Sequence, residues 1–388
     1  MMFEFMHKDI RVAGFEIDDY SGSIAGRIAV YNVEHMPLDT VVKGDIIDPA
    51  RFRAWWAGRT IPASRQGIRE FFEALDINNS MQLLARSMAL SLSDHYWVKP
   101  EGSDLQWKDV NFFSNDFSDD IGDLLFGSRM YAESMDLSSP DITTEGNLKK
   151  RWRIVGGRRM LFKGGSGTIR QEPLNEVIAS RLMQRLGVDH VDYDLIWEGR
   201  QPYSVCEDFV TPSTEFVSAY HVMKSMPNTS NSSVYDHYVA CCRENGLDVV
   251  PDLDRMIVID HLMANGDRHT NNFSILRDPD TLEWISSAPI FDTGSSLGAN
   301  LSDAEIRMSV GEGCKPFAKT FGKQLKLVTD LSWIDMECVE STAEDIRSVL
   351  GSSMHISDER TDAVAESFMT RARAVGRIVA DHRPRANR

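Results

Sequence analysis

Cysteine is scarce in this chain of 388 residues, and long apolar runs and a basic surplus are missing. The five cysteines show no CxxC or mixed Cys/His spacing, so no zinc site is expected, and reduced thiols in a cytoplasmic compartment are predicted. No run of about eighteen apolar residues occurs, so no membrane span is expected. Glu, Lys and Asp interrupt the first twenty residues, which therefore do not resemble a signal peptide.

Basic residues are outnumbered by acidic ones. The chain has 42 Lys and Arg against 58 Asp and Glu, and its formal net charge is −16 at pH 7. Direct binding to nucleic acid is not expected, because phosphate contacts need a surplus of Lys and Arg. The same charge opposes an approach to anionic membranes. With 42% hydrophobic residues the chain has ample core material, and its length suggests two or three domain-sized units.

A set of polar residues between Asn265 and Gly294 is typical of phosphoryl transfer. Asp267 is followed five positions later by Asn272, and Asp292 opens an Asp-Thr-Gly run. One carboxylate can orient an attacking hydroxyl, while an Asn oxygen and a second carboxylate hold Mg²⁺ against the nucleotide phosphates. The runs FSIL and API are predicted as two strands of a hairpin. That hairpin would bring the Asn and the second Asp to one point in space.

These motifs also have interpretations other than phosphoryl transfer. A single Asp-Thr-Gly is often a turn, and it also opens the catalytic loop of aspartic proteases. A protease would need a second motif of this kind, and the chain has none. His269 is expected to support the loop through hydrogen bonds and not to act as a base.

The segment upstream contains a lysine and a glutamate at a spacing that fits the same chemistry. RWRIV and RMLFK are predicted as strands joined by a Gly-Gly turn, with Lys163 at the end of the second strand. The helix EPLNEVIASRLMQRLG carries Glu176 and is terminated by Gly187. A strand lysine that pairs with a glutamate on the next helix can hold the inner phosphates of a nucleotide.

A phosphate-covering loop is expected over residues 138–152, before the first of these strands. It contains only one glycine, Gly146, and so lacks the repeated glycines of eukaryotic protein kinases. Backbone N–H groups near this glycine and the ammoniums of Lys149 and Lys150 are the candidate phosphate ligands.

With these motifs the chain resembles the HipA family of bacterial serine/threonine kinases. The matching residues are Thr143 to Gly146, Lys163, Asn175-Glu176, CEDFV at 206–210, DRHTNNFSI at 267–275 and PIFDTG at 289–294. The resemblance implies that Asp267 is the catalytic base and that Asn272 and Asp292 bind Mg²⁺. It also implies that Lys163 binds phosphate and that Glu207, Asp208 and Phe209 form the hinge that contacts adenine. In that family a hydroxyl of the phosphate loop can be phosphorylated, which silences the enzyme. Thr143 falls at that position, and Thr144 is the alternative.

The expected fold class is α+β, with a bilobal protein-kinase-like fold, an additional N-terminal subdomain and an all-α C-terminal lobe. The expected parts are an N-terminal α+β subdomain (1–135), a nucleotide-binding N-lobe core (136–210) and a mainly helical C-lobe with the catalytic and metal-binding loops (211–388). The N-terminal part is predicted to hold a strand at SIAGRIAVYNV and helices at ARFRAWWAG, GIREFFEALD and SMQLLARSMALSL. VPDLDRMIVIDHLMAN is predicted as an apolar helix that leads into the catalytic loop, and a last helix begins near SDERTD.

Together these features predict a kinase that uses ATP and Mg²⁺ on a Ser or Thr hydroxyl of an unidentified protein, with autophosphorylation in the phosphate loop. Two alternatives stay open. Phosphoinositide kinases share the GDRH…N and D-x-G pattern, although the acidic charge opposes a membrane substrate. A toxin-type nucleotide-binding module could instead act through an antitoxin-like partner, but a silent module has no need of the complete Lys/Asp/Asn/Asp set.

Overall fold

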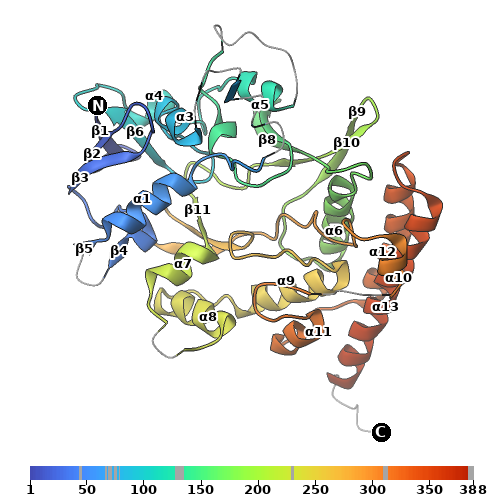
Figure 1. Ribbon diagram of the computed structural model, residues 1–388. Coiled ribbons are helices and arrows are strands. Elements are labelled where there is room, and N and C mark those ends of the chain that lie inside the picture. Colours follow the sequence, from blue (N-terminus) through green and yellow to red (C-terminus); the bar gives the residue numbers. More distant parts are fainter. Residues whose placement is uncertain are drawn as a thin grey trace.

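The computed structural model describes residues 1–42, 46–65, 68, 72–73, 77, 79–126, 135–228, 231–308 and 313–382. It shows a mixed α/β architecture with several sheets. In Figure 1 the N-terminal sheet lies on the side opposite to the two long C-terminal helices, and the rest of the chain fills the space between them. Among the described residues, no helix is both long and apolar enough to cross a membrane.

The N-terminal region is built on a four-stranded antiparallel sheet in the order β3-β2-β1-β6. Phe5 and Phe15 on one face of this sheet pack against Phe52 and Trp56 of the following helix, and all four side chains are buried. Asp48 caps that helix, because its carboxylate accepts hydrogen bonds from two backbone N–H groups of the first turn. The elements are β1 (Met2–His7), β2 (Ile10–Ile17), β3 (Ile24–Val30), α1 (Pro49–Gly58), α3 (Ser80–Arg86) and β6 (Tyr96–Pro100).

Two of the predicted N-terminal elements are confirmed, the strand at β3 and the helix at α1. The helix predicted over SMQLLARSMALSL is too long: α3 ends at Arg86, because Met88 and Ala89 adopt left-handed backbone angles that a helix cannot contain. The helix predicted at GIREFFEALD lies mostly outside the described residues. β1 and β2 were not predicted from the sequence.

A second four-stranded antiparallel sheet, in the order β7-β8-β10-β9, forms the central part. Gly156 and Gly157 make the turn between its first two strands, both with the positive φ that a tight hairpin turn requires. The helix that follows ends at Gly187, whose φ of 64° closes the helix, as predicted. The elements are β7 (Lys150–Val155), β8 (Arg158–Gly164), α6 (Glu172–Leu186), β9 (Asp194–Glu198) and β10 (Gln201–Glu207).

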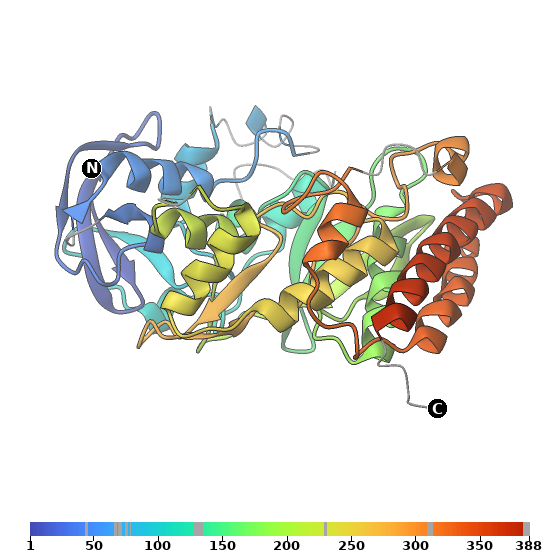
Figure 2. The ribbon, with the colours of Figure 1, turned by 90° about the horizontal axis from the view of Figure 1, so that it is seen from below.

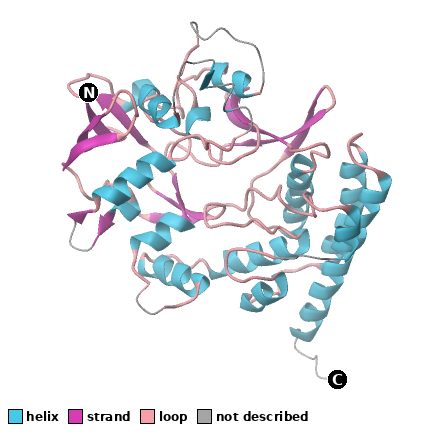
Figure 3. Ribbon diagram, in the orientation of Figure 1, coloured by secondary structure: helices cyan, strands magenta, loops and turns pink. Residues whose placement is uncertain are grey.

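The C-terminal part is mainly helical, and Figure 3 shows that helices dominate the side that holds the C terminus. α12 and α13 pack against each other, and α6 and α9 share one large hydrophobic core with them (Figure 2). The helices are α7 (Ala219–Ser225), α8 (Val234–Glu244), α9 (Val250–Met263), α10 (Asp303–Met308), α11 (Phe321–Gln324), α12 (Met336–Gly351) and α13 (Asp358–His382). The prediction of α9 is confirmed, and so is that of the last helix.

The expectation of an all-α C-terminal lobe is wrong. A three-stranded antiparallel sheet, β11 (Glu215–Ser218), β12 (Ser274–Arg277) and β13 (Trp284–Ser287), lies within it. FSIL does form a strand, but its hairpin partner is β13 and not API. Asp278 holds the turn by accepting hydrogen bonds from the N–H groups of residues 280 and 281. The chain beyond this hairpin then crosses to the central part, where Ile290 pairs with His190.

The remaining short elements connect these layers. Three of them, η3, α4 and α5, lie between the N-terminal sheet and the central sheet in sequence. They are η1 (Leu38–Thr40), β4 (Val41–Val42), β5 (Ile46–Ile47), α4 (Trp107–Val110), α5 (Asp120–Leu125), η3 (Pro140–Thr143) and η4 (Leu325–Leu327).

Candidate active site

Lys163 is the centre of the candidate site. It lies near the end of β8, is buried, and its Nζ contacts Glu176 Oε1 at 2.8 Å, Tyr193 Oη at 3.0 Å and Asp292 Oδ1 at 3.0 Å. Burial opposes the charge of this ammonium, but Asp292 and Glu176 more than offset that effect and hold the pKa of Lys163 well above its usual value. The structure therefore brings together three of the residues singled out in the sequence, and it adds Tyr193.

Glu176 lies on the buried face of α6, and its second oxygen accepts a hydrogen bond from Ser204 Oγ on β10. Ser204 is the cross-strand neighbour of Lys163, so the register of the sheet lets both side chains reach Glu176 on α6. Burial raises the pKa of Glu176, although the ammonium partly offsets the shift. These contacts fix the direction in which Lys163 points.

Asp292 lies in the segment that follows β13. Its backbone has a φ of 56°, in the left-handed region that few residues other than glycine, Asn and Asp adopt. Burial would favour the neutral acid, but Lys163 and Lys150 offset that effect and keep the pKa of Asp292 well below its usual range. The carboxylate is therefore ionised, as a metal ligand must be.

Arg268 anchors the loop between α9 and β12, and sequence reasoning missed it. The side chain is fully buried: Nε and Nη2 donate to the two carboxylate oxygens of Asp260 at 3.0 and 2.9 Å. Nη1 donates to the backbone oxygens of Asn272 at 2.8 Å and Phe291 at 2.5 Å. Loss of either charge would leave the other buried without its partner, at a cost of about 3–5 kcal/mol. The Arg268 guanidinium thus links α9 to the backbone at Asn272 and to the backbone next to Asp292.

Asn272 and Asp292 line one cavity together with His269 and Asn271, although the FSIL–API hairpin expected to bring them together does not form. The Nδ1 atom of His269 accepts a hydrogen bond from the backbone of Asn271 at 3.3 Å, in keeping with a supporting role. Asp267 is not among the residues that line this cavity. It is half-exposed, and its Oδ1 accepts a hydrogen bond from Lys315 Nζ at 2.8 Å.

The cavity has a volume of about 840 Å³ and lies between the central sheet, the C-terminal part and the N-terminal region. The three predicted hinge residues, Glu207, Asp208 and Phe209, line it, and so do apolar side chains that an adenine ring could contact. The N-terminal region contributes a wall that was not predicted. Apolar and N-terminal lining residues include Leu161, Val191, Phe291, Arg51, Trp55, Arg59 and Thr60.

The phosphate loop is clamped by Arg65, another residue that was not predicted. This guanidinium is buried, donates from Nε to the backbone oxygen of Gly146 at 3.0 Å, and contacts the backbone oxygen of Thr144. Gly146 has a φ of 94°, and the ammonium of Lys150 lies only 2.4 Å from the position that a Cβ on this residue would take. Lys150 Nζ donates a hydrogen bond to the backbone oxygen of Glu145 at 2.9 Å. Both Gly146 and Lys150 line the cavity, where the sequence predicted phosphate ligands.

Lys150 predicts a pH dependence of nucleotide binding. Burial lowers its pKa to about 8, so the ammonium is charged at pH 7 and mostly neutral at pH 9. Because phosphates favour the charged form, we expect nucleotide affinity to fall by about tenfold between these pH values. Titration calorimetry with ATP would measure it. Lys150→Arg, which stays charged, is expected to lose this dependence, and an unchanged dependence in the variant would exclude Lys150 as its source.

The side chains present fit a magnesium–nucleotide complex. Asp292 and Asn272 offer a carboxylate and an amide oxygen, the hard donors that Mg²⁺ prefers. Within the described ranges, no group of three or more His, Cys, Asp and Glu gathers into a metal cage. A Mg²⁺ ion held at this site would therefore need nucleotide oxygens and water for its remaining positions, which is its usual mode in phosphoryl-transfer sites.

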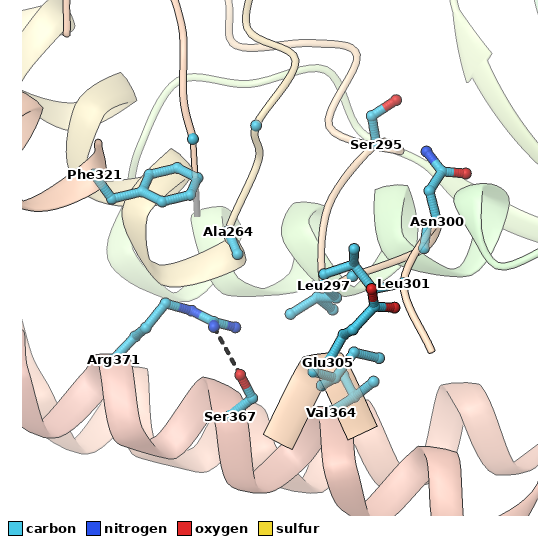
Figure 4. A pocket seen from close by; sticks show the side chains of 15 residues that line it. Ala264, Ser295, Leu297, Asn300, Leu301, Glu305, Phe321, Val364, Ser367 and Arg371 are labelled. Carbon is cyan, nitrogen blue, oxygen red and sulfur yellow. Dashed lines mark hydrogen bonds between the residues drawn. The ribbon is translucent and has the colours of Figure 1, made fainter. Parts of the chain in front are cut away.

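A second, smaller cavity of about 140 Å³ lies behind the catalytic loop, between Ala264 and the helices α10 and α13 (Figure 4). Arg371 points toward it and donates a hydrogen bond to Ser367 at 2.8 Å. None of the side chains predicted for the site lines this cavity. Lys163, Asn272, Asp292 and the predicted hinge residues line the large cavity instead.

A mixed α/β fold in which a strand lysine contacts a helix glutamate and a loop aspartate is a kinase-like architecture. Residues 143–373 match the family model of the HipA-like C-terminal domain, and the chain therefore belongs to the HipA-like family. No sequence among the curated proteins matches the chain.

Two of the solved structures that resemble this one illustrate the fold. HipA of Shewanella oneidensis MR-1, solved as a toxin–antitoxin complex with HipB and operator DNA, is 13% identical, and the match covers 97% of each chain with a TM-score of 0.56. The Helicobacter pylori proinflammatory kinase CtkA is 16% identical over 60% of this chain and 94% of its own, with a TM-score of 0.46. The likeness to HipA supports the fold over the whole chain.

Proposed function

We propose that this protein is a kinase that transfers the terminal phosphoryl group of ATP, with Mg²⁺, to a Ser or Thr hydroxyl of a protein. The observation that carries the proposal is the three-way contact of Lys163 with Glu176 and Asp292. It places a charged ammonium and an ionised carboxylate at the wall of a cavity large enough for a nucleotide. A buried lysine used only for structure would need one carboxylate partner and no cavity.

Each residue would have a separate task. The hinge residues Glu207 to Phe209 would contact adenine, and Lys163 would hold the inner phosphates. Asn272 and Asp292 would bind Mg²⁺, which supplies charge neutralisation at the phosphates. Asp267 would orient the acceptor hydroxyl and accept its proton. These roles follow from the family. The positions of Lys163, Asn272 and Asp292 at the cavity support theirs, whereas Asp267 lies outside the lining residues.

The alternatives are distinguished by the acceptor. A lipid kinase would need to approach an anionic surface, against the net charge of −16. The Shewanella HipA structure contains an antitoxin and DNA, and its likeness to this chain favours a toxin-type role with an antitoxin-like partner. We propose that any binding to DNA would be made by such a partner, because the acidic chain is unsuited to bind DNA itself. The five free cysteines fit a cytoplasmic protein.

A direct assay tests the proposal. Purified protein is incubated with labelled ATP and Mg²⁺, alone, with a lysate of bacterial proteins, and with phosphoinositide vesicles. Label on a protein Ser or Thr, mapped by mass spectrometry, is the expected result. Label on lipid alone would favour the lipid kinase, and nucleotide binding without any transfer would favour the partner-dependent module.

The phosphate loop gives a prediction about regulation. Thr143 Oγ1 donates to the Leu90 and Pro140 backbone oxygens at 2.9 and 3.2 Å, and Thr144 Oγ1 accepts from the Trp152 indole at 2.9 Å. Because Thr143 is buried, a phosphate on it cannot remain in this loop conformation, so its phosphorylation should open the loop and lower ATP affinity.

The variants Thr143→Glu and Thr143→Val separate charge from the lost hydroxyl. We expect ATP affinity to fall at least about tenfold in the first and to change little in the second, as measured by calorimetry. Intact-mass analysis after ATP incubation should find the phosphate within residues 138–150. A phosphate found only elsewhere, or equal ATP affinity in Thr143→Glu and the parent, would contradict this regulation.

A further inference from the structure

The catalytic loop has little positive charge available for the phosphoryl group in transfer. Of the residues from Asp267 to Asn272, Arg268 is the only Lys or Arg. Its guanidinium is fully buried and is occupied by Asp260 and by two backbone oxygens. Lys163 and Lys150 lie at the other wall, where the inner phosphates are expected. Negative charge on the outer phosphoryl oxygens needs a cation at the acceptor side of the cavity as well.

Lys315, 48 residues beyond Asp267 in the chain, places an ammonium beside that carboxylate, outside the side chains that line the cavity. Its Nζ lies 2.8 Å from Asp267 Oδ1. The lysine side chain is 58% exposed and the aspartate 50%, so the pair contributes little to stability. A contact of this kind with no structural task, beside the carboxylate that is proposed to take the acceptor proton, points to a role in the reaction.

The segment that carries Lys315 is held against the catalytic loop on both sides. Gln324 is buried, and its Oε1 accepts hydrogen bonds from the N–H groups of Phe317 and Ala318 at 3.1 and 3.3 Å. The ring of Phe317 packs edge-on against Phe273, with centroids 5.6 Å apart. Phe317 and Ala318 follow Lys315 by two and three residues, so this anchoring limits how far the lysine backbone can move from Asp267.

The contact between Gly313 and Gly266 fixes the other side. The Gly313 carbonyl oxygen lies 3.0 Å from the position that a Cβ on Gly266 would take, so a side chain there would push the segment away. Both glycines border the small cavity of Figure 4, which lies behind the loop. The backbone therefore presents Lys315 to Asp267 from a position set by close packing and not by the ion pair alone.

We propose that Lys315 is a positioning residue of the phosphoryl-transfer site: it orients Asp267 and neutralises the transferred phosphoryl group. This inference rests on the proposed kinase function. During transfer the acceptor oxygen bonds to the γ-phosphorus, the bond from that phosphorus to the bridging oxygen of ADP breaks, and the hydroxyl proton passes to Asp267. An ammonium beside this carboxylate stays within reach of the phosphoryl oxygens throughout the step.

The test compares Lys315→Met, Lys315→Arg and Lys319→Met. The last removes an exposed lysine of the same segment that has no role in the proposed site. We expect kcat to fall by about 100-fold in Lys315→Met with KM for ATP changed by less than about threefold, because the charge acts on the transition state. Lys315→Arg should recover part of the rate, and Lys319→Met should match the parent.

A binding measurement separates this inference from the proposed function. Lys315→Met should bind Mg·ADP as the parent does, but it should lose at least about tenfold in affinity for Mg·ADP with fluoroaluminate, a mimic of the transferred phosphoryl group. Equal loss for both ligands, or no loss, overturns the role of Lys315 alone. An increase of kcat in Lys315→Met also overturns it, since the pair would then be inhibitory. A parent chain that binds neither ligand overturns the kinase proposal and, with it, this inference.

Discussion

Asp292→Ala is expected to abolish phosphoryl transfer while the chain remains folded. This side chain is the ionised carboxylate that lines the cavity beside Asn272, so its removal takes away the proposed charged ligand of Mg²⁺. Metal stabilisation of the transferred charge is worth several kcal/mol, and each 1.36 kcal/mol corresponds to a factor of ten in rate. A loss of at least about 10³-fold in kcat follows.

The fold should tolerate this change because Lys163 keeps its contacts with Glu176 and Tyr193. Thermal melting and circular dichroism would check this point, and Asp292→Asn would test it again, since Asn also adopts the left-handed backbone found at this position. Glu340→Ala, which removes an exposed carboxylate from α12, is the matched control. Normal transfer by a folded Asp292→Ala protein would remove this residue from the metal site.

The parts of the site that could be predicted are set by local sequence. The Gly156-Gly157 turn and the helix stop at Gly187 fix β7, β8 and α6 within fewer than forty residues, and the Lys163–Glu176 contact lies inside this unit. The spacing between Asp267 and Asn272 is likewise a property of one short loop. In such cases turn chemistry and periodicity carry enough information.

The parts that could not be predicted depend on contacts between distant segments. Arg268 lies inside the DRHTNNFSI motif, but its partner Asp260 on α9 is set by the fold, and Arg65, which reaches across to the phosphate loop, belongs to no recognised motif. FSIL was predicted as a strand, but its pairing with β11 escaped detection for a related reason. β11 has four residues, and its partner strand lies more than fifty residues away, so no local pattern links the two.

The contribution of the N-terminal region to the cavity is the largest feature that the sequence did not predict, because it depends on contacts formed only in the folded chain. His7 of β1 contacts His35 at 2.8 Å and Glu215 of β11 at 3.0 Å, and Arg277 of β12 donates to Tyr96 at 2.9 Å. All five side chains are buried. This polar core joins the N-terminal sheet to the hairpin that follows the catalytic loop, and it explains how residues before position 65 come to form a wall of the cavity.

Asp267→Asn tests the step at which the acceptor loses its proton. The amide preserves the size of the side chain and can still accept a hydrogen bond from Lys315, so neither folding nor the loop should change. Because an amide is a far weaker proton acceptor, kcat should fall by about 10²–10⁴-fold, the usual contribution of general base catalysis.

Nucleotide affinity distinguishes this role from a binding role. Asp267 lies outside the residues that line the cavity, at a half-exposed position, so ATP and Mg²⁺ should bind to Asp267→Asn as tightly as to the parent. Steady-state kinetics combined with calorimetry would measure both quantities. If nucleotide affinity fell together with kcat, Asp267 would be a ligand of the metal or the phosphates. If kcat were unchanged, proton transfer would have to be assigned to a group that does line the cavity, and His269 would be the first to examine.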